Sequence, residues 1–391
     1  MAGSREFDIV VYGATGYTGR LVCEYLNETY GVGGDVTWAM GGRSQEKLEK
    51  IRDELGLDKS VALVVADTGD QSTVDDMVGR TKVLLTTVGP FQTYGSGVVK
   101  ACVEAGTDYV DLCGEPAWMK DMIEQYDETA KKNSARIVFS CGFDSIPSDI
   151  GILLLQETAK EKFGAPFARV KGRVVGMSGS ASGGSVASFK ATMAAAKEKP
   201  EMFGVLVDPF ALTEDFAGPE QPGGDKKIFE EEYDRYAAPF VMATINTKNV
   251  HRSNFLLGHA YGEDFVYDEM LLLPKRKEGE GKSEGKEKGS ADMAFDMSLK
   301  PGEGPTKEER ESGFYEIWYS GTNADGNFLR VVVKGDRDAG YGSTAKIVSE
   351  AAIYLVKNEG KGGCQTPAPA MGTPLVKRLV AHAGVTFDIE S

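Results

Sequence analysis

The stretch that decides the fold runs from Asp8 to Gly19 and reads DIVVYGATGYTG. An apolar run ends at Gly13, Gly16 and Gly19, and a helical pattern follows. Glycine in such a turn permits unusual backbone angles, close approach to a pyrophosphate and tight packing of helix on strand. The free amides at the start of the helix then face an anion. The pattern predicts a strand, a phosphate-binding turn and a helix.

The other residues of this turn that we expect to contact a dinucleotide are Thr15, Tyr17 and Thr18. The spacing G-x-x-G-x-x-G differs from the G-x-G-x-x-G pattern of many dinucleotide sites. An ordinary glycine-rich turn between strand and helix is therefore the alternative. The position of the turn, after the first strand and before the first helix, favours the cofactor site.

The end of the second predicted strand indicates which dinucleotide binds. Sites selective for NAD place an acidic residue there, whereas an arginine accommodates the 2′-phosphate of NADP. This chain has Arg43 and Ser44 at that point, with no acid at the strand end. We therefore expect NADP rather than NAD, with Ser44 also capping the next helix. The alternative is that Arg43 is only a solvated residue before a helix.

Two further strand ends contribute expected cofactor contacts. Asp67 follows the third strand, where it could accept from the adenine amino group or cap the next turn. Val88, Gly89 and Pro90 follow the fourth strand, at the carboxyl edge of the sheet, where ligands of open α/β sheets lie. Glycine permits close approach of the backbone to the cofactor, and proline stiffens the loop.

Strand and helix patterns alternate up to about residue 140, which predicts a doubly wound parallel sheet of the Rossmann type. We expect three parts: a dinucleotide-binding domain at 1–150, a second α+β domain at 151–340, and a segment at 341–391 that packs back on the first domain or the interdomain cleft. The Lys/Glu/Gly-rich stretch 275–290 is predicted to be a polar surface loop.

Two polar strand ends are predicted to face the same crevice. They are Asp111–Glu115 and Ser140–Asp149, and the second combines hydroxyls and carboxylates in a short stretch. A helix over 150–155 capped by Ser148 or Asp149 would explain part of this density. The turn at 178–185 is rich in Ser and Gly and precedes a helical pattern, so it suits an anion or the nicotinamide, or is a flexible loop.

Composition excludes several classes of function. The chain has 391 residues and a net charge of −15, which argues against a nucleic-acid surface. Its five cysteines lack C-x-x-C spacing and its three histidines lack the spacing of metal ligands. There is no apolar N-terminal signal region and no apolar run long enough for a membrane span. We therefore expect a cytoplasmic, reducing location, no metal and no disulfide framework.

Several motifs occur together in an order that resembles a known family. They are Gly13–Gly19, Ala39–Ser44, Val88–Phe91, Tyr109–Glu115, Gly142–Asp149, Gly335–Tyr341 and Gly362–Pro367. Together they resemble the saccharopine dehydrogenase-like oxidoreductases, which include the trans-acting enoyl reductases of bacterial lipid biosynthesis. The resemblance covers almost the whole chain. It implies an NADP-type Rossmann domain and a second α/β domain, and it leaves the substrate open. Some members carry an apolar, membrane-associating stretch where this chain has its polar insert.

Hydride transfer needs orientation, exclusion of water and polarisation of the acceptor more than a nucleophile. No tyrosine here has a lysine four residues on, which argues against the short-chain dehydrogenase scheme. The candidates for substrate positioning or proton donation are Asp144 and Ser145, with Tyr341 as a weaker one. Cys113 and Cys141 stand at strand ends and could be reactive, although a free cysteine is more often a small buried residue.

Three functions remain open from the sequence. The first is an NADP-dependent oxidoreductase that reduces an enoyl or carbonyl group of a lipid-like substrate, with association to a lipid surface or a homo-oligomer left open. The second is an NADP-binding regulator or scaffold without turnover. The third is saccharopine dehydrogenase proper, whose dicarboxylate substrate would require several arginines. The stretch 178–260 contains only two arginines, Arg235 and Arg252, which weakens the hypothesis of a saccharopine dehydrogenase proper.

Overall fold

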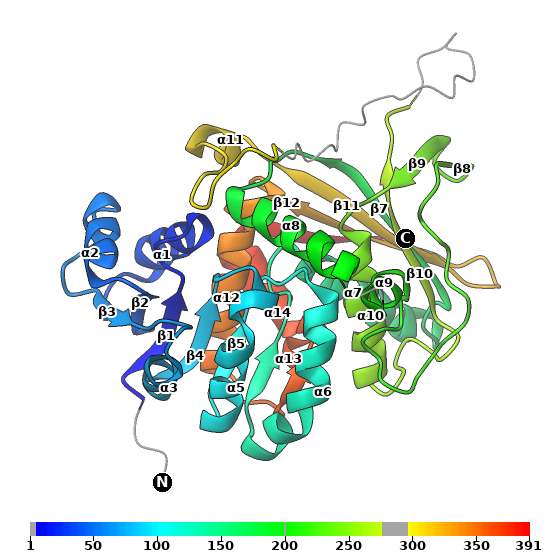
Figure 1. Cartoon of the computed structure of the whole chain (residues 1–391). Helices are drawn as coiled ribbons and strands as arrows, with labels where there is room; N and C mark the ends of the chain where they lie inside the picture. Colours follow the sequence, from blue (N-terminus) through cyan, green and yellow to red (C-terminus); the bar gives the residue numbers. More distant parts are fainter. Residues whose placement is uncertain (1–4, 199–200, 276–295) are drawn as a thin grey trace.

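The first sheet has seven strands in the order β13-β6-β5-β4-β1-β2-β3, all parallel to their neighbours. The computed structural model describes residues 5–198, 201–275 and 296–391. The strands are β1 (Phe7–Tyr12), β2 (Trp38–Gly42), β3 (Ala62–Val65), β4 (Thr81–Thr86), β5 (Asp108–Val110), β6 (Arg136–Val138) and β13 (Gly363–Gln365). Figure 1 shows helices in front of and behind this sheet. The predicted doubly wound Rossmann-type sheet is confirmed.

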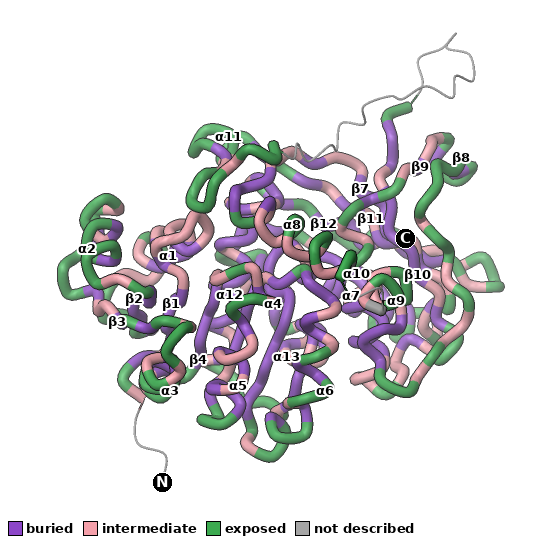
Figure 2. Tube along the Cα trace, viewed as in Figure 1, coloured by how far each residue is buried: buried purple, intermediate pink, exposed green. Residues whose placement is uncertain are grey.

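Side chains alternate along β1 and bury both faces of the sheet. Ile9 and Val11 join one hydrophobic cluster, while Val10 and Tyr12 join another on the opposite face. Such a run without a polar face is typical of a central parallel strand. The covering helices are α1 (Tyr17–Tyr30), α2 (Gln45–Glu54), α3 (Gln71–Gly79), α4 (Phe91–Tyr94), α5 (Ser96–Ala105), α6 (Pro116–Asn133) and α12 (Thr344–Lys357). In Figure 2 the central strands of this sheet are buried, whereas the edge strand β3 is only partly buried and the outer helix α2 is largely exposed.

The second sheet is mixed, with the order β14-β12-β11-β7-β10-β9-β8. Only β7 and β10 pair in parallel among its described strands. The strands are β7 (Arg169–Met177), β8 (Ile228–Glu230), β9 (Arg235–Pro239), β10 (Val266–Leu272), β11 (Tyr315–Thr322), β12 (Phe328–Gly335) and β14 (Val385–Glu390). Strands β11 and β12 form an antiparallel hairpin, in whose turn the Asn323 amide donates to the Asn327 carbonyl at 3.0 Å.

The remaining helices belong to the second half of the chain or connect the two sheets. They are α7 (Ile146–Phe163), α8 (Gly183–Glu198), α9 (Glu201–Val207), α10 (Ala243–Leu256), α11 (Lys307–Glu311), α13 (Pro367–Met371), α14 (Pro374–Arg378) and the π-helical turns η1 (Ala339–Ser343) and η2 (Leu379–Ala383). Helices α7 and α10 pack against strands of the second sheet. Apolar side chains of both helices, among them Ile150 and Val250, join Ile9 and Val11 of β1 in one hydrophobic cluster, so this core extends through both sheets.

The segment after residue 341 contributes a strand to each sheet. Strand β13 pairs with β6 in the first sheet, and β14 pairs with β12 in the second. Helix α12, which precedes both strands in the sequence, packs against α1. The buried Glu350 of α12 accepts from Tyr25 at 2.7 Å and Tyr30 at 2.6 Å, both on α1. The C-terminal segment therefore ties the two sheets together.

Several predicted element bounds are wrong. Helix α7 begins at Ile146 rather than at 150, so Ser148 and Asp149 are buried inside its first turns and are not caps. The reason is Pro147, whose fixed backbone angle and missing amide suit the first turn of a helix. The region 255–273 contains the end of α10 and then strand β10. The predicted polar loop 275–290 lies outside the described residues except at its first position.

Candidate cofactor and active site

A cavity of about 1010 Å³ lies between the carboxyl edge of the first sheet and the second half of the chain. Its volume is at the upper end of the range of ligand pockets, which suits a dinucleotide together with a substrate. The first sheet contributes the glycine-rich turn and the ends of β2, β4, β5 and β6. The second half contributes one face of α8, the start of α10 and η1. Gly13, Thr15, Gly16, Tyr17 and Thr18 all line this cavity, as the sequence predicts.

The glycines of the turn leave room that a larger residue would fill. Gly13 has φ +95°, and a Cβ there would lie 2.6 Å from the Thr87 hydroxyl oxygen. A Cβ at Gly19 would lie 2.1 Å from the Gly13 carbonyl oxygen, so α1 packs directly on the turn. Gly19 is buried and does not line the cavity. Gly16 precedes α1 with no side-chain cap, which leaves the first helical amides free for an anion. This turn fits the pyrophosphate of a dinucleotide.

Four cationic side chains line the cavity where β2 ends: Arg20, Arg43, Lys47 and Lys50. Arg20 and Lys50 both pair with Glu54, at 3.3 and 3.6 Å. Neither Arg43 nor Lys47 forms an ion pair within the part of the chain that the structure describes. Two uncompensated cations at this point fit the 2′-phosphate of NADP. The sequence prediction named Arg43 and missed Lys47, although a second cation on the first turn of α2 was a visible signal.

Ser44 and Asp67 do not line the cavity. Ser44 caps α2, and its hydroxyl accepts from the Lys47 amide at 3.3 Å. Asp67 is exposed, and its carboxylate accepts from the Gly69 amide at 2.9 Å. The structure therefore shows both side chains in local capping contacts, and the neighbouring Thr68 reaches the cavity wall instead.

The loop after β4 lies along the cavity and is held by a buried carboxylate. Val88, Gly89 and Pro90 line the cavity, as the sequence predicts. Glu115, at the end of the next strand, accepts from the Phe91 amide at 3.0 Å and from the Gln92 amide at 2.9 Å. The polar strand end at 111–115 therefore shapes the loop.

Asp144 lines the cavity from the loop between β6 and α7. Burial raises the pKa of its carboxyl group to about 7. Helix α12 holds the turn that contains Asp144, because the Phe143 amide donates to the hydroxyl of Thr344, the first residue of α12, at 3.0 Å. A buried carboxyl group that titrates near neutral pH can hold a proton and release it.

Ser145 is fully buried and does not reach the cavity. Its hydroxyl donates to the Asn246 side-chain oxygen at 2.6 Å and accepts from the Asn249 side-chain nitrogen at 2.8 Å. Both asparagines belong to α10, so this hydroxyl joins the start of α7 to α10. The geometry fits a residue that positions Asp144 rather than one that contacts substrate.

Tyr341, on η1, lines the cavity next to the glycine-rich turn. Its hydroxyl oxygen accepts from the Ser182 amide and lies 2.7 Å from the Ser185 hydroxyl. Its ring meets the ring of Tyr17 edge to face, with centroids 5.1 Å apart. The Ser/Gly-rich turn at 178–185 therefore leads into the cavity.

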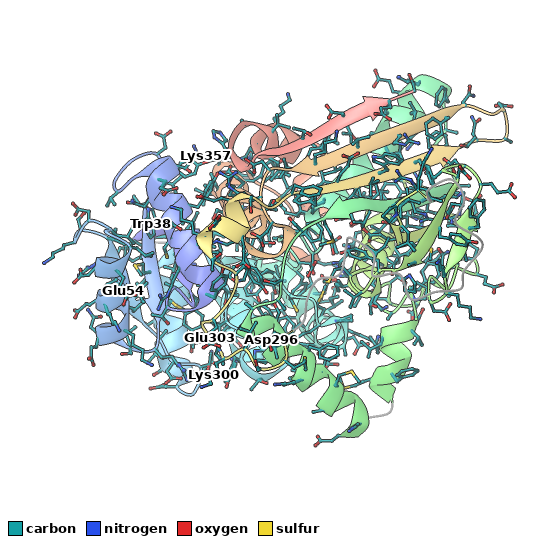
Figure 3. The ribbon with its side chains drawn as sticks, turned by 90° about the horizontal axis from the view of Figure 1, so that it is seen from above. Trp38, Glu54, Asp296, Lys300, Glu303 and Lys357 are labelled. Carbon is teal, nitrogen blue, oxygen red and sulfur yellow. The ribbon has the colours of Figure 1, made fainter. Side chains whose placement is uncertain are left out.

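A segment of the second half crosses over the glycine-rich turn. The Tyr17 hydroxyl donates to the Pro305 carbonyl and accepts from Arg310 at 2.9 Å. The Gly183 amide, at the start of α8, donates to the Glu303 carbonyl at 2.9 Å. Figure 3 shows Lys300 and Glu303 beside the start of α8, between that helix and α1. The segment 303–310 therefore contacts both the glycine-rich turn and the start of α8.

The far end of the cavity has an apolar wall. On α8, the lining positions follow helical spacing, from Ser185 to Ser188 and Phe189 and then to Thr192 and Met193. Further lining residues are Leu206 on α9 and Val241, Met242 and Ile245 near the start of α10. The wall changes from hydroxyls beside Tyr341 to apolar side chains farther along α8.

Neither arginine of the stretch 178–260 lines the cavity. Arg252 is fully buried and donates to the carbonyls of Leu212 and Cys364, at 2.5 and 2.6 Å. Cys113 and Cys141 are also fully buried, and burial raises the pKa of both thiols well above its usual value. Such thiols are poor nucleophiles.

No metal-binding group of three or more His, Cys, Asp or Glu occurs among the described residues. Over the same residues, no helix is long and apolar enough to cross a membrane.

Comparison with known proteins identifies the family. A family model described as the saccharopine dehydrogenase NADP binding domain matches residues 9–138. The chain is 36% identical to a putative trans-acting enoyl reductase of Mycobacterium tuberculosis, with 99% of this chain and 98% of the relative covered. It is 35% identical to the trans-acting enoyl reductase of Mycobacterium ulcerans, with 97% and 96% covered.

A solved structure shares the fold at low sequence identity. The apo saccharopine dehydrogenase (L-Glu forming) of Saccharomyces cerevisiae matches with a TM-score of 0.55 at 12% identity, covering 98% of this chain and 99% of that one. The family model and the cationic end of the cavity agree on NADP as the cofactor. The chain belongs to the saccharopine dehydrogenase-like oxidoreductases, together with the trans-acting enoyl reductases.

Proposed function

We propose that this protein is a reductase that transfers hydride from NADPH to an enoyl or carbonyl group of a lipid-like substrate, with Asp144 supplying the proton. The main support for the proposal is that a single cavity is lined by the glycine-rich phosphate-binding turn, by a carboxyl group with a pKa of about 7 and by an apolar wall. The names of the relatives, trans-acting enoyl reductases, support the enoyl group as the acceptor.

The proposed chemistry requires one hydride and one proton. NADPH, when bound, supplies the hydride, and reduction of an enoyl group then requires a proton at the neighbouring carbon. Asp144 is suited to this step because its carboxyl group lines the cavity and is largely protonated below pH 7. After this step Asp144 is a buried carboxylate. Because burial disfavours the charged form, the group takes up a proton again from solvent.

Tyr341 and Ser185 are placed to polarise the acceptor. The Tyr341 oxygen accepts from the Ser182 amide, which leaves its own proton for donation to Ser185 or to a substrate oxygen. Hydrogen bonds aimed at a developing negative charge are a large source of rate enhancement. We assign this pair to the carbonyl oxygen of an enoyl thioester or ketone.

The substrate assignment rests on the wall of the cavity. Phe189, Met193 and Leu206 supply apolar surface beyond the hydroxyl groups, and no arginine lines the cavity outside the cofactor end. A dicarboxylate such as saccharopine would leave its charges without partners there, which costs several kcal/mol per group. An apolar chain attached to an activated double bond fits the same wall.

The experiment is NADPH oxidation by the purified protein against enoyl thioesters, ketones, quinones and saccharopine, with NADPH binding measured separately by fluorescence. We expect turnover with an enoyl thioester and a loss of at least 100-fold in kcat in Asp144→Asn, with NADPH affinity unchanged. Asp388→Asn, at an exposed acid on β14 outside the cavity, is the control. Tight NADPH binding without reduction of any acceptor would favour a regulator, and turnover of saccharopine would overturn the substrate assignment.

A further inference from the structure

The apolar wall of the cavity continues onto the outer surface of the protein. Five large apolar side chains there are exposed: Phe203 and Val207 on α9 at 62% each, Val241 at 55%, and Met193 and Phe189 on α8 at 49% and 45%. Three of them, Phe189, Met193 and Val241, also line the cavity. We call these five residues the distal tract. Contiguous apolar surface of this kind on a soluble domain marks a binding site more often than single exposed residues do.

Four of the five residues of the distal tract lie on two helices that pack against each other, and Val241 precedes α10. Phe189 and Met193 are four residues apart on α8, and so are Phe203 and Val207 on α9, so each helix presents an apolar stripe. Figure 3 shows these two helices, in green, extending away from the sheets at the edge of the molecule. The tract thus begins inside the cavity and ends on a projecting edge.

The end of α9 is anchored, which fixes the tract relative to the cavity. The Lys248 ammonium group donates to the Leu206 carbonyl at 2.8 Å and to the Thr244 carbonyl at 3.0 Å. Leu206 lines the cavity, and the next residue, Val207, is exposed. The boundary between cavity wall and outer surface therefore passes between two neighbouring residues of one helix.

We propose that the distal tract binds the far part of the substrate's apolar chain, so that the substrate is a long-chain acyl thioester rather than a short one. This inference rests on the proposed function, because the reacting group is placed beside Asp144. Continuity of the tract with the cavity is the argument for this occupant. A chain that starts at the polar end of α8 and follows its apolar face reaches Met193 and Val241, which both line the cavity and are exposed, and α9 packs against α8.

The energetic consequence is a dependence of affinity on chain length. Each methylene transferred from water to apolar surface raises affinity roughly fourfold. In the wild-type protein, affinity should continue to rise with chain length beyond the length that fills the cavity. Without Phe203 and Val207, the outer residues of the distal tract, affinity should stop rising at that length.

The test measures binding of saturated acyl-pantetheine thioesters, which have no enoyl double bond to reduce, to the protein loaded with NADP⁺, which carries no hydride. Chain lengths increase in steps of two carbons, below the concentration at which each thioester forms micelles. The variant is Phe203→Ser with Val207→Ser, whose side chains do not line the cavity. The control is Val380→Ser with Ile389→Ser, a pair exposed at 50% and 45% outside the tract.

We expect the variant to bind short thioesters and NADP⁺ as the wild type does, and to lose at least tenfold affinity for the longest chains. Identical chain-length profiles for variant and wild type, or no thioester binding at any length, would overturn the proposal. Loss of binding to phosphatidylcholine vesicles with an unchanged profile would instead assign the tract to a lipid surface. Because the thioesters are saturated, chain-length dependence without enoyl reduction would leave the tract standing and reject only the proposed reaction.

Discussion

The hydroxyl oxygens of Tyr341 and Ser185 lie 2.7 Å apart, although the two residues are separated by 156 positions in the chain. Tyr341 comes from η1, directly before the helix α12 that packs on the first sheet, and Ser185 comes from α8 of the second half. The pair meets at the cavity wall, beside the glycine-rich turn. This contact therefore places hydroxyl groups from two separate parts of the chain where a substrate oxygen would be polarised.

Tyr341→Phe removes this hydroxyl and keeps the ring that contacts Tyr17. We expect kcat to fall by roughly 10- to 100-fold, because one donor to a developing oxyanion is lost. NADPH affinity should change little, because the ring contact stays. Steady-state kinetics and NADPH fluorescence titration, on a variant whose thermal unfolding matches the wild type, give the two quantities. Weaker NADPH binding with unchanged kcat would show that the hydroxyl serves the cofactor turn instead.

Arg43→Ala and Lys47→Ala should each weaken binding of NADP by about tenfold and leave NAD binding nearly unchanged. The physical reason is the loss of a charge-assisted contact with the 2′-phosphate, a group that NAD lacks. The difference should shrink at high salt because these side chains are exposed. Isothermal titration of both cofactors at two ionic strengths measures it.

Lys50→Ala is the matched control for this pair. Lys50 lines the same end of the cavity, but it pairs with Glu54 at 3.6 Å. Its removal should weaken NADP less than removal of Arg43 or Lys47 does. Equal losses of NADP and NAD affinity in the two test variants would contradict the assignment of the 2′-phosphate.

Much of the cofactor half of the site could be predicted because its signals are local. The turn residues, Arg43 and the loop at 88–90 stand at strand ends, and in a parallel sheet all strand ends meet at one edge. Asp144 was predicted for the same reason, from the end of the sixth strand. The geometry of these positions follows from the alternation of strands and helices alone.

The substrate half could not be predicted from local patterns because it is assembled from distant segments. Nothing in the sequence places Ser185 beside Tyr341, or the face of α8 opposite Asp144. Ser145 was singled out with Asp144 because a hydroxyl beside a carboxylate suggests chemistry. Only the fold shows that Asn246 and Asn249 occupy both of its hydrogen-bonding directions.

Gly19→Ala should destabilise the protein by about 1–3 kcal/mol, the usual cost of overpacking. The added Cβ would lie 2.1 Å from the Gly13 carbonyl oxygen, so α1 must shift from the turn. NADP affinity should fall with it, because the turn loses its shape. Urea unfolding and cofactor titration measure both effects.

Gly79→Ala is the comparison for this change. Gly79 is also a helical glycine, and a Cβ there meets nothing within 4 Å. Alanine is the better helix former, so this variant should be as stable as the wild type or more stable. If both alanine variants unfolded at the same urea concentration, close packing of α1 on the turn would not be what requires glycine at position 19.

Asp111 is expected to make folding stability depend on pH between the unfolded pKa of 3.8 and the folded pKa of about 7. Its carboxyl group is fully buried, and burial raises its pKa to about 7, although hydrogen bonds from the amides of Cys113 and Ser140 oppose the shift. The folded protein therefore holds a proton that the unfolded chain, with a pKa near 3.8, releases. The stability from this group is fully present below that unfolded value and is lost as pH rises through 7.

Asp111→Asn mimics the protonated form and should reduce this pH dependence. One carboxyl oxygen accepts from both amides, at 3.0 and 2.8 Å, and the other meets the Tyr109 hydroxyl at 2.8 Å. An asparagine can keep its oxygen on the amides and donate to the tyrosine oxygen, so the network remains satisfied. We expect the variant to match the wild type only near pH 4, close to the unfolded pKa of 3.8, and to be more stable at pH 8, as measured by urea unfolding. Asp111→Ala, which leaves both amides without a partner, should lose about 2 kcal/mol or more at either pH. Equal pH slopes for wild type and Asp111→Asn would show that Asp111 is ionised in the folded protein across this range.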